Sequence, residues 1–292
     1  MKKIVVVGCG YIGTRVARIW NESGAEVTCL VRSPEHQAVL VSEGFTTRSC
    51  SFDDPADIPA LAVAGCIVYY LVPPPGGGIT DSRARLFCTA ISGSAPPARI
   101  IYMSATSVYG EKNGGIVTES SATNPSAAMG KRRLDAEQTF REYGAAAGVP
   151  IIILRVSGIY GPGRLPLMQI SQGQPLLREE ESGPGNRIQA DDLARICRAA
   201  AVKGMAGDIF NVSDGHPSSM TTYFNACADV LGYPRQPQVT MEEARRVMSP
   251  LMFSYVSESR VVDNTRMREQ LGVSLQYPTI AEGLAVSVET PH

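Results

Sequence analysis

Three glycines near the start of the chain have a spacing that can bring backbone N–H groups onto a phosphate. Gly8, Gly10 and Gly13 form a G-x-G-x-x-G pattern directly after an aliphatic run, and a helical pattern follows. Gly8 permits a tight turn, Gly10 lets the backbone approach a pyrophosphate, and Gly13 lets the helix pack close to the strand. With the intervening Tyr11 and Ile12, they predict a dinucleotide-binding turn at a helix N-terminus.

The end of the second predicted strand indicates which dinucleotide is bound. Arg32 and Ser33 follow Val31 where an NAD-selective fold places an acidic residue on the ribose 2′-hydroxyl. An arginine beside a hydroxyl suits a 2′-phosphate instead, so we expect NADP(H) to be favoured over NAD(H). Val72 and Pro73, at the end of a later strand, are expected to complete the site. The alternative is that Arg32 is a solvated loop charge.

Composition excludes several classes of function. The formal net charge is −1 without a basic stripe, so neither nucleic acid nor an anionic membrane is an expected partner. The apolar runs are too short to span a bilayer, and the first one stops at Gly8, so no signal peptide is predicted. Seven scattered cysteines without a C-x-x-C pattern predict reduced thiols and a cytoplasmic protein. With three histidines in the chain, no metal site is expected.

The elements that must position these residues alternate between strand and helix. Strands are predicted at residues 4–7, 27–31, 66–72, 100–104, 151–156 and 209–212, and helices at 14–22, 34–43, 82–92 and 130–147. Nearly continuous apolar strands between helices predict an α/β fold with a doubly wound parallel sheet covered on both faces.

Glycine- and proline-rich loops break this pattern after about residue 161. The sequence therefore predicts a dinucleotide-binding domain over 1–163. A smaller, interleaved C-terminal substrate-binding region is expected over 164–292, with segments near 188–215 returning to the core of the first domain.

Six motifs occur in a fixed order along nearly the whole chain. They are the glycine pattern, Ser-x-x-x-Val-Tyr-Gly at 104–110, the stretches 154–164, 188–194 and 210–215, and the tail 271–284. In this order they resemble the extended or atypical branch of the short-chain dehydrogenase/reductase superfamily, of the NAD(P)-dependent nucleotide-sugar epimerase/dehydratase type. The resemblance implies a Rossmann fold, a nicotinamide cofactor and a sugar or nucleotide-sugar substrate.

The catalytic pair of that family is missing here. The resemblance implies a Tyr-x-x-x-Lys pair whose phenol moves a proton beside the hydride acceptor. Met129 and Arg133 stand at these two positions. A thioether has no ionisable proton, whereas an arginine could still meet a ribose hydroxyl. The family's catalytic hydroxyl falls at Ala105, so Ser104 or Thr106 could serve instead, unless these hydroxyls only satisfy backbone groups at the strand end.

Three phenols are candidates for the missing proton donor. All three, Tyr102, Tyr109 and Tyr160, could lie near the nicotinamide, and Tyr160 is the phenol that we expect to act as the donor. The alternative for each is packing in the core.

Basic side chains indicate where an anionic ligand would bind. The resemblance places Arg155 beside the cofactor, together with Ser104 and Arg133, and it places Arg164 near the substrate with Ser107. Arg187 is expected to extend this substrate site. Surface salt bridges are the alternative.

Two short polar stretches have simpler explanations than catalysis. Asp191 and Asp192 suit the start of a helix, although a pair of acids makes a metal conceivable. His216 precedes serines that suit a helix cap. The resemblance also makes a homodimer through the helices at 82–92 and 130–147 an expectation.

The chain is therefore expected to be an NADP(H)-dependent oxidoreductase or epimerase-like enzyme with a non-standard proton donor or impaired catalysis. The alternative is a non-catalytic NADP(H)-binding sensor or partner-binding protein.

Overall fold

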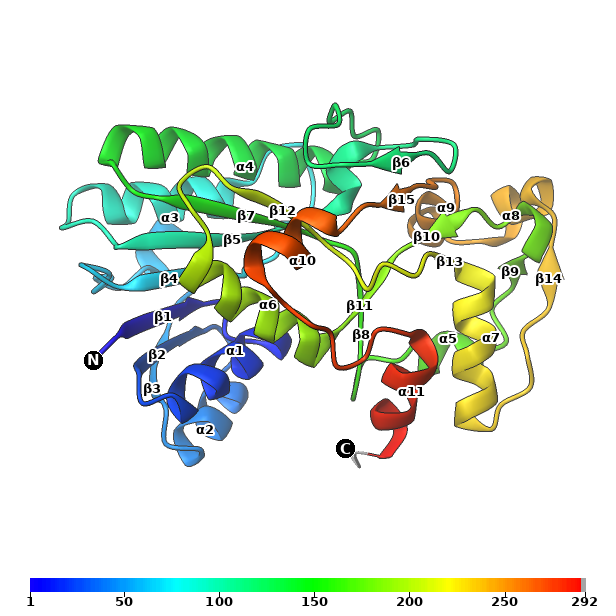
Figure 1. Ribbon diagram of the computed structural model, residues 1–292, viewed down its shortest axis with the longest axis horizontal. Coiled ribbons are helices and arrows are strands. Elements are labelled where there is room, and N and C mark those ends of the chain that lie inside the picture. The colour runs from blue at the N-terminus through cyan, green and yellow to red at the C-terminus, as the bar shows by residue number, and fades with distance from the viewer. Residues whose placement is uncertain (290–292) are drawn as a thin grey trace.

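A seven-stranded parallel sheet forms the centre of the molecule (Figure 1). The computed structural model describes residues 1–289. The strand order is β12-β7-β5-β4-β1-β2-β3, so the winding direction reverses between β1 and β4, where folds of this class bind ligands at the carboxyl ends of the strands. The strands are β1 (Lys3–Val7), β2 (Glu26–Val31), β3 (Thr46–Ser49), β4 (Ile67–Tyr70), β5 (Arg99–Ala105), β7 (Ile151–Val156) and β12 (Ile209–Val212).

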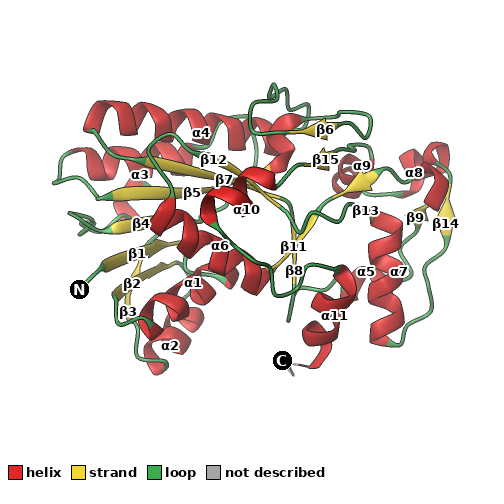
Figure 2. Cartoon of the chain, in the orientation of Figure 1, coloured by secondary structure: helices red, strands yellow, loops and turns green. Residues whose placement is uncertain are grey.

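Helices cover both faces of the sheet (Figures 1 and 2). On one face lie α1 (Tyr11–Glu22), α2 (Pro34–Ser42), α6 (Ala190–Lys203) and α10 (Thr265–Leu271). On the other lie α3 (Ser82–Ser92) and α4 (Ala128–Ala147). Trp20 and Leu193 belong to the first core, and Phe87 and Phe140 belong to the second. The predicted doubly wound α/β fold is confirmed.

Burial on both faces explains the apolar strands that made the sheet predictable. Every residue of β7 is buried, as are four of the five in β1. The edge strand β3, with the sequence Thr-Thr-Arg-Ser, is mostly exposed, and its polar sequence gave no strand signal. The helices α1 and α4 begin at Tyr11 and Ala128, slightly before the predicted starts.

A smaller region, called the cap below, lies beyond the carboxyl ends of the strands, on the right in Figure 1. Its helices are α5 (Leu167–Ser171), α7 (Met220–Leu231), α8 (Met241–Val247), α9 (Pro250–Val256) and α11 (Ile280–Glu289). The strands β9 (Leu176–Leu177), β10 (Pro184–Gly185), β13 (Ser218–Ser219) and β14 (Gln238–Val239) also belong to it. Tyr160, Tyr223, Phe224 and Leu284 pack together in the core of the cap.

The chain passes repeatedly between the sheet and the cap. The strand β8 (Gly158–Tyr160) pairs with β11 (Arg187–Gln189), and β6 (Ile116–Val117) pairs with β15 (Val261–Val262). After the cap has begun, α6 and β12 return to the sheet. Within residues 1–289, every helix is too short or too polar to cross a membrane.

Candidate functional site

The glycine loop between β1 and α1 leaves open space above an uncapped helix. Gly8 has φ +82°, and a Cβ on it would lie 2.9 Å from the Val72 backbone nitrogen. A Cβ on Gly13 would lie 2.9 Å from the Gly8 carbonyl oxygen, so this helix residue must stay small. A Cβ on Gly10 would meet nothing within 4 Å, and no side chain caps α1. The first-turn N–H groups are therefore available to an anion.

A first cleft of about 360 Å³ lies beside this loop at the carboxyl ends of β1 to β4. Among the predicted cofactor residues, it is lined by Gly8, Gly10, Arg32, Ser33, Val72 and Pro73. Ile12 and Gly13 are buried in the first turn of α1 beneath the loop. The predicted cofactor residues and the first cleft therefore lie at the same edge of the sheet.

Two arginines meet one carboxylate at the mouth of the first cleft. Arg32 Nη1 lies 3.3 Å from Asp53 Oδ2, and Arg83 Nε lies 2.6 Å from Asp53 Oδ1. The hydrogen bond from Arg83 holds the pKa of Asp53 below its usual range. Arg83 also donates to the Pro73 carbonyl, 3.0 Å away. Sequence reasoning missed Asp53 and Arg83, because Asp53 follows the undetected strand β3.

His36 braces the glycine loop. Its Nε2 lies 2.8 Å from the Cys9 carbonyl oxygen and 3.2 Å from Thr14 Oγ1. Ser33 caps α2, and its hydroxyl donates to Glu35 over 2.5 Å. The loop and the following helix are thus fixed by side chains around the cleft.

A second cleft of about 380 Å³ lies at the carboxyl ends of β5 and β7, between the sheet and the cap. The predicted residues that line it are Thr106, Ser107, Met129, Arg164 and Arg187. Ser157 also lines it and was not predicted. The hydroxyls of Ser107 and Ser157 are buried without a hydrogen-bond partner, which is uncommon for buried polar groups.

Arg187 is a buried cation that forms no ion pair within residues 1–289, although the buried carboxyl of Asp214 acts on its pKa. Its side chain is 8% exposed, and the guanidinium lies 4.3 Å from the centroid of the Tyr223 ring. Nη1 donates to the Asn186 carbonyl over 3.3 Å, and no ion pair to Arg187 exists within residues 1–289. Burial lowers the pKa of Arg187, because a charged guanidinium is less stable away from water. An anionic ligand in the cleft would stabilise that charge.

The two residues at the positions of the family pair have different surroundings. Met129 is 41% exposed and lines the second cleft from the first turn of α4. Arg133 does not line either cleft and donates from Nη1 to the Met103 carbonyl over 2.7 Å. The thioether cannot transfer a proton, and the arginine is engaged with the backbone.

The side chains of Ser104 and Arg155 are engaged in a buried polar network. Ser104 Oγ donates to Glu137 Oε1 over 2.7 Å, and Arg155 contacts both oxygens of the same carboxylate. Arg155 Nη1 also donates to the Tyr109 hydroxyl over 3.0 Å, and that hydroxyl donates to Asn211 Oδ1 over 2.6 Å. None of these five side chains lines either cleft.

The other predicted phenols are core residues. Tyr160 is fully buried in the cap, where its hydroxyl donates to the Thr279 carbonyl over 3.3 Å and burial raises its pKa. Tyr102 stacks on Phe140 at 4.8 Å, and burial raises its pKa to about 12. Neither ring lines a cleft, so neither phenol reaches the open space.

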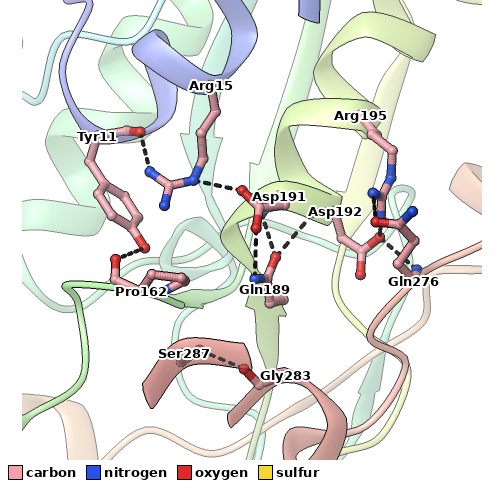
Figure 3. A network of polar contacts seen from close by, with 10 residues as sticks. All are labelled: Tyr11, Arg15, Pro162, Gln189, Asp191, Asp192, Arg195, Gln276, Gly283 and Ser287. Atoms are coloured by element: carbon pink, nitrogen blue, oxygen red, sulfur yellow. Dashed lines mark hydrogen bonds and ion pairs between the residues drawn. The ribbon is translucent and has the colours of Figure 1, made fainter. Parts of the chain in front are cut away.

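The paired acids Asp191 and Asp192 serve the protein itself (Figure 3). Asp191 accepts from Arg15 over 2.8 Å, and Asp192 accepts the backbone N–H groups of Gln276 and Tyr277, each over 2.9 Å. The side chain of Gln189 caps α6. These contacts account for both carboxylates without a metal.

The remaining predicted side chains lie outside both clefts. His216 is exposed, and its backbone N–H donates to Asp214. The helix after it is capped by Ser219, which confirms the capping interpretation.

Two family models match segments of the chain. The model of the NAD dependent epimerase/dehydratase family matches residues 83–213, and the model described as pyridine nucleotide-disulphide oxidoreductase matches residues 3–40. The first segment runs from α3 past β12, and the second contains the glycine loop. The first match confirms the resemblance that the motifs predicted.

Similar proteins cover nearly the full length of the chain. Protein YeeZ of Escherichia coli (strain K12) is 25% identical over 95% of this chain and 97% of its own. A functionally unknown conserved protein from Silicibacter pomeroyi is 27% identical and covers 99% of both chains with a TM-score of 0.84. UDP-glucuronic acid 4-epimerase from Bacillus cereus, solved with UDP-glucuronic acid and NAD, is 20% identical and covers 98% of both chains with a TM-score of 0.75.

Proposed function

We propose that the chain binds NADP(H) in the first cleft and a sugar or nucleotide-sugar in the second, as the match of residues 83–213 to the NAD dependent epimerase/dehydratase family suggests. The observation that carries this proposal is Arg187, a buried guanidinium that lines the second cleft and forms no ion pair within the described residues, with the buried carboxyl of Asp214 as the acid that acts on it. A diphosphate would supply a negatively charged partner. The unpartnered hydroxyls of Ser107 and Ser157 would donate hydrogen bonds to sugar or phosphate oxygens there. The Bacillus cereus structure holds a UDP-sugar in a molecule of the same fold.

Preference for NADP(H) is supported by the charges around the first cleft. Arg32, Arg83 and the Ser33 hydroxyl lie where the second strand ends, and a single carboxylate, Asp53, contacts both arginines. A 2′-phosphate could therefore take the place of Asp53 on one of the two guanidinium groups, while Glu35 engages the Ser33 hydroxyl. The glycine loop would hold the pyrophosphate on the uncapped first turn of α1.

We further propose that catalysis is impaired. The cleft side chain at the family phenol position is the thioether of Met129, while Ser104 and Tyr160 are enclosed elsewhere. Thr106 is the one predicted catalytic hydroxyl that lines the second cleft, and an alcohol without a basic partner is a weak proton donor. This observation also favours the second candidate function, a non-catalytic NADP(H)-dependent sensor or partner-binding protein.

Calorimetric titration tests the proposal. We expect NADP⁺ to bind more tightly than NAD⁺, and UDP-glucose or UDP-glucuronic acid to bind the wild-type chain but not Arg187→Ala. A matched control is Arg178→Ala, because Arg178 is exposed and outside both clefts. Failure of both dinucleotides to bind refutes the cofactor site. Binding of the sugar nucleotide by Arg187→Ala as tightly as by the wild-type chain refutes the substrate site in the second cleft.

Turnover measurements with bound nicotinamide then separate the two candidates. Saturable binding of UDP-sugars without oxidation or epimerisation supports the sensor, whereas slow turnover that fails in Thr106→Val supports an enzyme with a reassigned donor.

We also propose a cytoplasmic location and a homodimeric assembly. All seven cysteines are free thiols, which suits a reducing cytoplasmic compartment. A homodimer through α3 and α4 follows the family expectation, and light scattering after gel filtration tests it.

A further inference from the structure

Tyr11 physically joins the glycine loop to the loop that carries Arg164 (Figure 3). It is the first residue of α1, directly after Gly10 of the first cleft. Its hydroxyl donates to the Pro162 carbonyl oxygen over 2.9 Å, across 151 positions of sequence. Arg164, two residues after Pro162, lines the second cleft. One side chain therefore spans the space between the two clefts.

The Tyr11 ring is held between two guanidinium groups. The Arg15 guanidinium lies 4.0 Å from the ring centroid, and that of Arg164 lies 5.2 Å from it. Such cation–π contacts fix the ring while leaving the hydroxyl directed at the loop. Burial raises the pKa of Tyr11, so the phenol remains a hydrogen-bond donor at neutral pH.

The 161–164 loop is shaped around the Tyr11 hydroxyl. Gly161 has φ +150°, and a Cβ on it would lie 2.8 Å from that hydroxyl and 3.1 Å from the Ala190 Cβ. The turn is closed by the Arg164 N–H, which donates to the Gly161 carbonyl over 3.0 Å. A residue larger than glycine would push the loop away from Tyr11.

Arg15 anchors the other side of Tyr11 (Figure 3). Its Nη1 donates to the Tyr11 carbonyl over 2.9 Å, and its Nε donates to Asp191 over 2.8 Å. Asp191 in turn accepts from the Gln189 side chain over 3.1 Å. The start of α1 is thereby tied to the start of α6, and the Tyr11 hydroxyl ties it to the 161–164 loop as well.

We propose that Tyr11 is a positioning residue that couples the two clefts, so that a dinucleotide bound at the glycine loop orders the 161–164 loop and sets Arg164 for an anionic ligand in the second cleft. The identities of the two ligands rest on the proposed function. A pyrophosphate on the first turn of α1 restricts the motion of that turn, and the Tyr11 hydroxyl passes this restriction to Pro162. Coupling of this kind is reciprocal, so the second ligand also tightens dinucleotide binding.

Hydrogen–deuterium exchange with NADP⁺ as the probe tests the coupling. In the wild-type chain, NADP⁺ should slow exchange in peptides covering the glycine loop and in those covering 161–164, the latter by about fivefold or more. Tyr11→Phe keeps the ring between the arginines and removes only the hydroxyl. It should retain the slowing at the glycine loop and lose it at 161–164. Tyr233→Phe, in which the altered ring is partly exposed and outside both clefts, is the matched control.

The outcomes separate this inference from the proposed function. Equal slowing at 161–164 in Tyr11→Phe overturns the coupling, as does slowing confined to the glycine loop in the wild-type chain. In both cases the cofactor site stands. Absence of any NADP⁺ effect at the glycine loop overturns the proposed function and the coupling together.

An affinity cycle distinguishes coupling from a merely structural role. A structural role would weaken UDP binding in Tyr11→Phe by the same factor with and without NADP⁺. We expect instead that NADP⁺ raises UDP affinity about fivefold or more in the wild-type chain and leaves it nearly unchanged in Tyr11→Phe. Equal enhancement in both chains contradicts the coupling.

Discussion

Arg155 and Glu137 form a two-pronged ion pair in the interior of the molecule. Arg155 Nε lies 3.0 Å from Glu137 Oε1, and Nη2 lies 2.8 Å from Oε2. Glu137 is 0% exposed, and Ser104 donates to the same carboxylate. The pair joins α4 to β7 behind the second cleft. Its fully matched geometry offsets the cost of removing two charges from water.

Removing one member of this pair should destabilise the fold. Arg155→Met leaves the buried Glu137 carboxylate with only the longer contact to the partly exposed Arg141, 3.4 Å away, and we expect a loss of about 3 kcal/mol in the free energy of unfolding, measured with urea. The double variant Arg155→Met/Glu137→Gln should recover part of that loss, because no isolated charge remains. NADP⁺ affinity of folded Arg155→Met should match the wild-type value. A large decrease in NADP⁺ affinity would instead show that Arg155 contributes to the cofactor site.

Restoring the family pair should create or increase turnover. In Met129→Tyr/Arg133→Lys a phenol would stand on the first turn of α4, facing the second cleft that Met129 lines. We expect nicotinamide reduction with UDP-glucose or UDP-glucuronic acid to rise about 100-fold or more, the scale of general acid–base catalysis. Met129→Phe/Arg133→Lys has the same ring without the hydroxyl and should remain at the wild-type rate. Equal rates for the two double variants would contradict a role for the phenol.

Arg32 should discriminate between the two dinucleotides. Arg32→Ala removes one of the two guanidinium groups around Asp53. We expect NADP⁺ affinity to fall about tenfold while NAD⁺ affinity stays the same, because NAD⁺ carries no 2′-phosphate. Arg48→Ala is the control, since Arg48 lies on the edge strand β3 outside the cleft. Equal losses for NADP⁺ and NAD⁺ would mean that Arg32 acts only on the shape of the loop.

Asp214 should make stability depend on pH. Burial raises its pKa to about 6, and one of its oxygens has no hydrogen-bond partner. A raised carboxyl pKa favours the folded state below the unfolded value of 3.8, and this contribution is lost as the pH rises through about 6. The loss amounts to about 3 kcal/mol.

Asp214→Asn removes that titration. Relative to the wild-type chain, its free energy of unfolding should therefore improve between pH 4 and pH 7, as followed by urea unfolding at several pH values. A difference between the two chains that does not change with pH would show that Asp214 is solvated.

The sequence predicted the sheet and the glycine loop because both depend on local patterns. Continuous apolar strands such as β7 and a fixed glycine spacing are visible without knowing which segments meet. The helices α1 to α4 followed from the same periodicity. The edge strand β3 escaped because its exposed residues need not be apolar.

The candidate site was less predictable because side-chain partners come from distant segments. Ser104 has the position expected of a cleft hydroxyl, yet Glu137 from α4 engages it. Asp53 and Arg83 meet across 30 positions, and no spacing rule connects them. Ser157 lies within the 154–164 motif, but only its buried, unpartnered hydroxyl in the structure marks it.

The paired strands between the sheet and the cap also govern how a ligand can enter. A molecule whose halves share one connection can open about a single hinge. Here β8 with β11 and β6 with β15 tie the halves at separate points. A rotation that keeps both ties is limited to the axis that joins them, so we expect the width of the second cleft to change little. Entry and exit must then proceed through local movement of its rim, and ligand exchange should be fast without a slow global closing step.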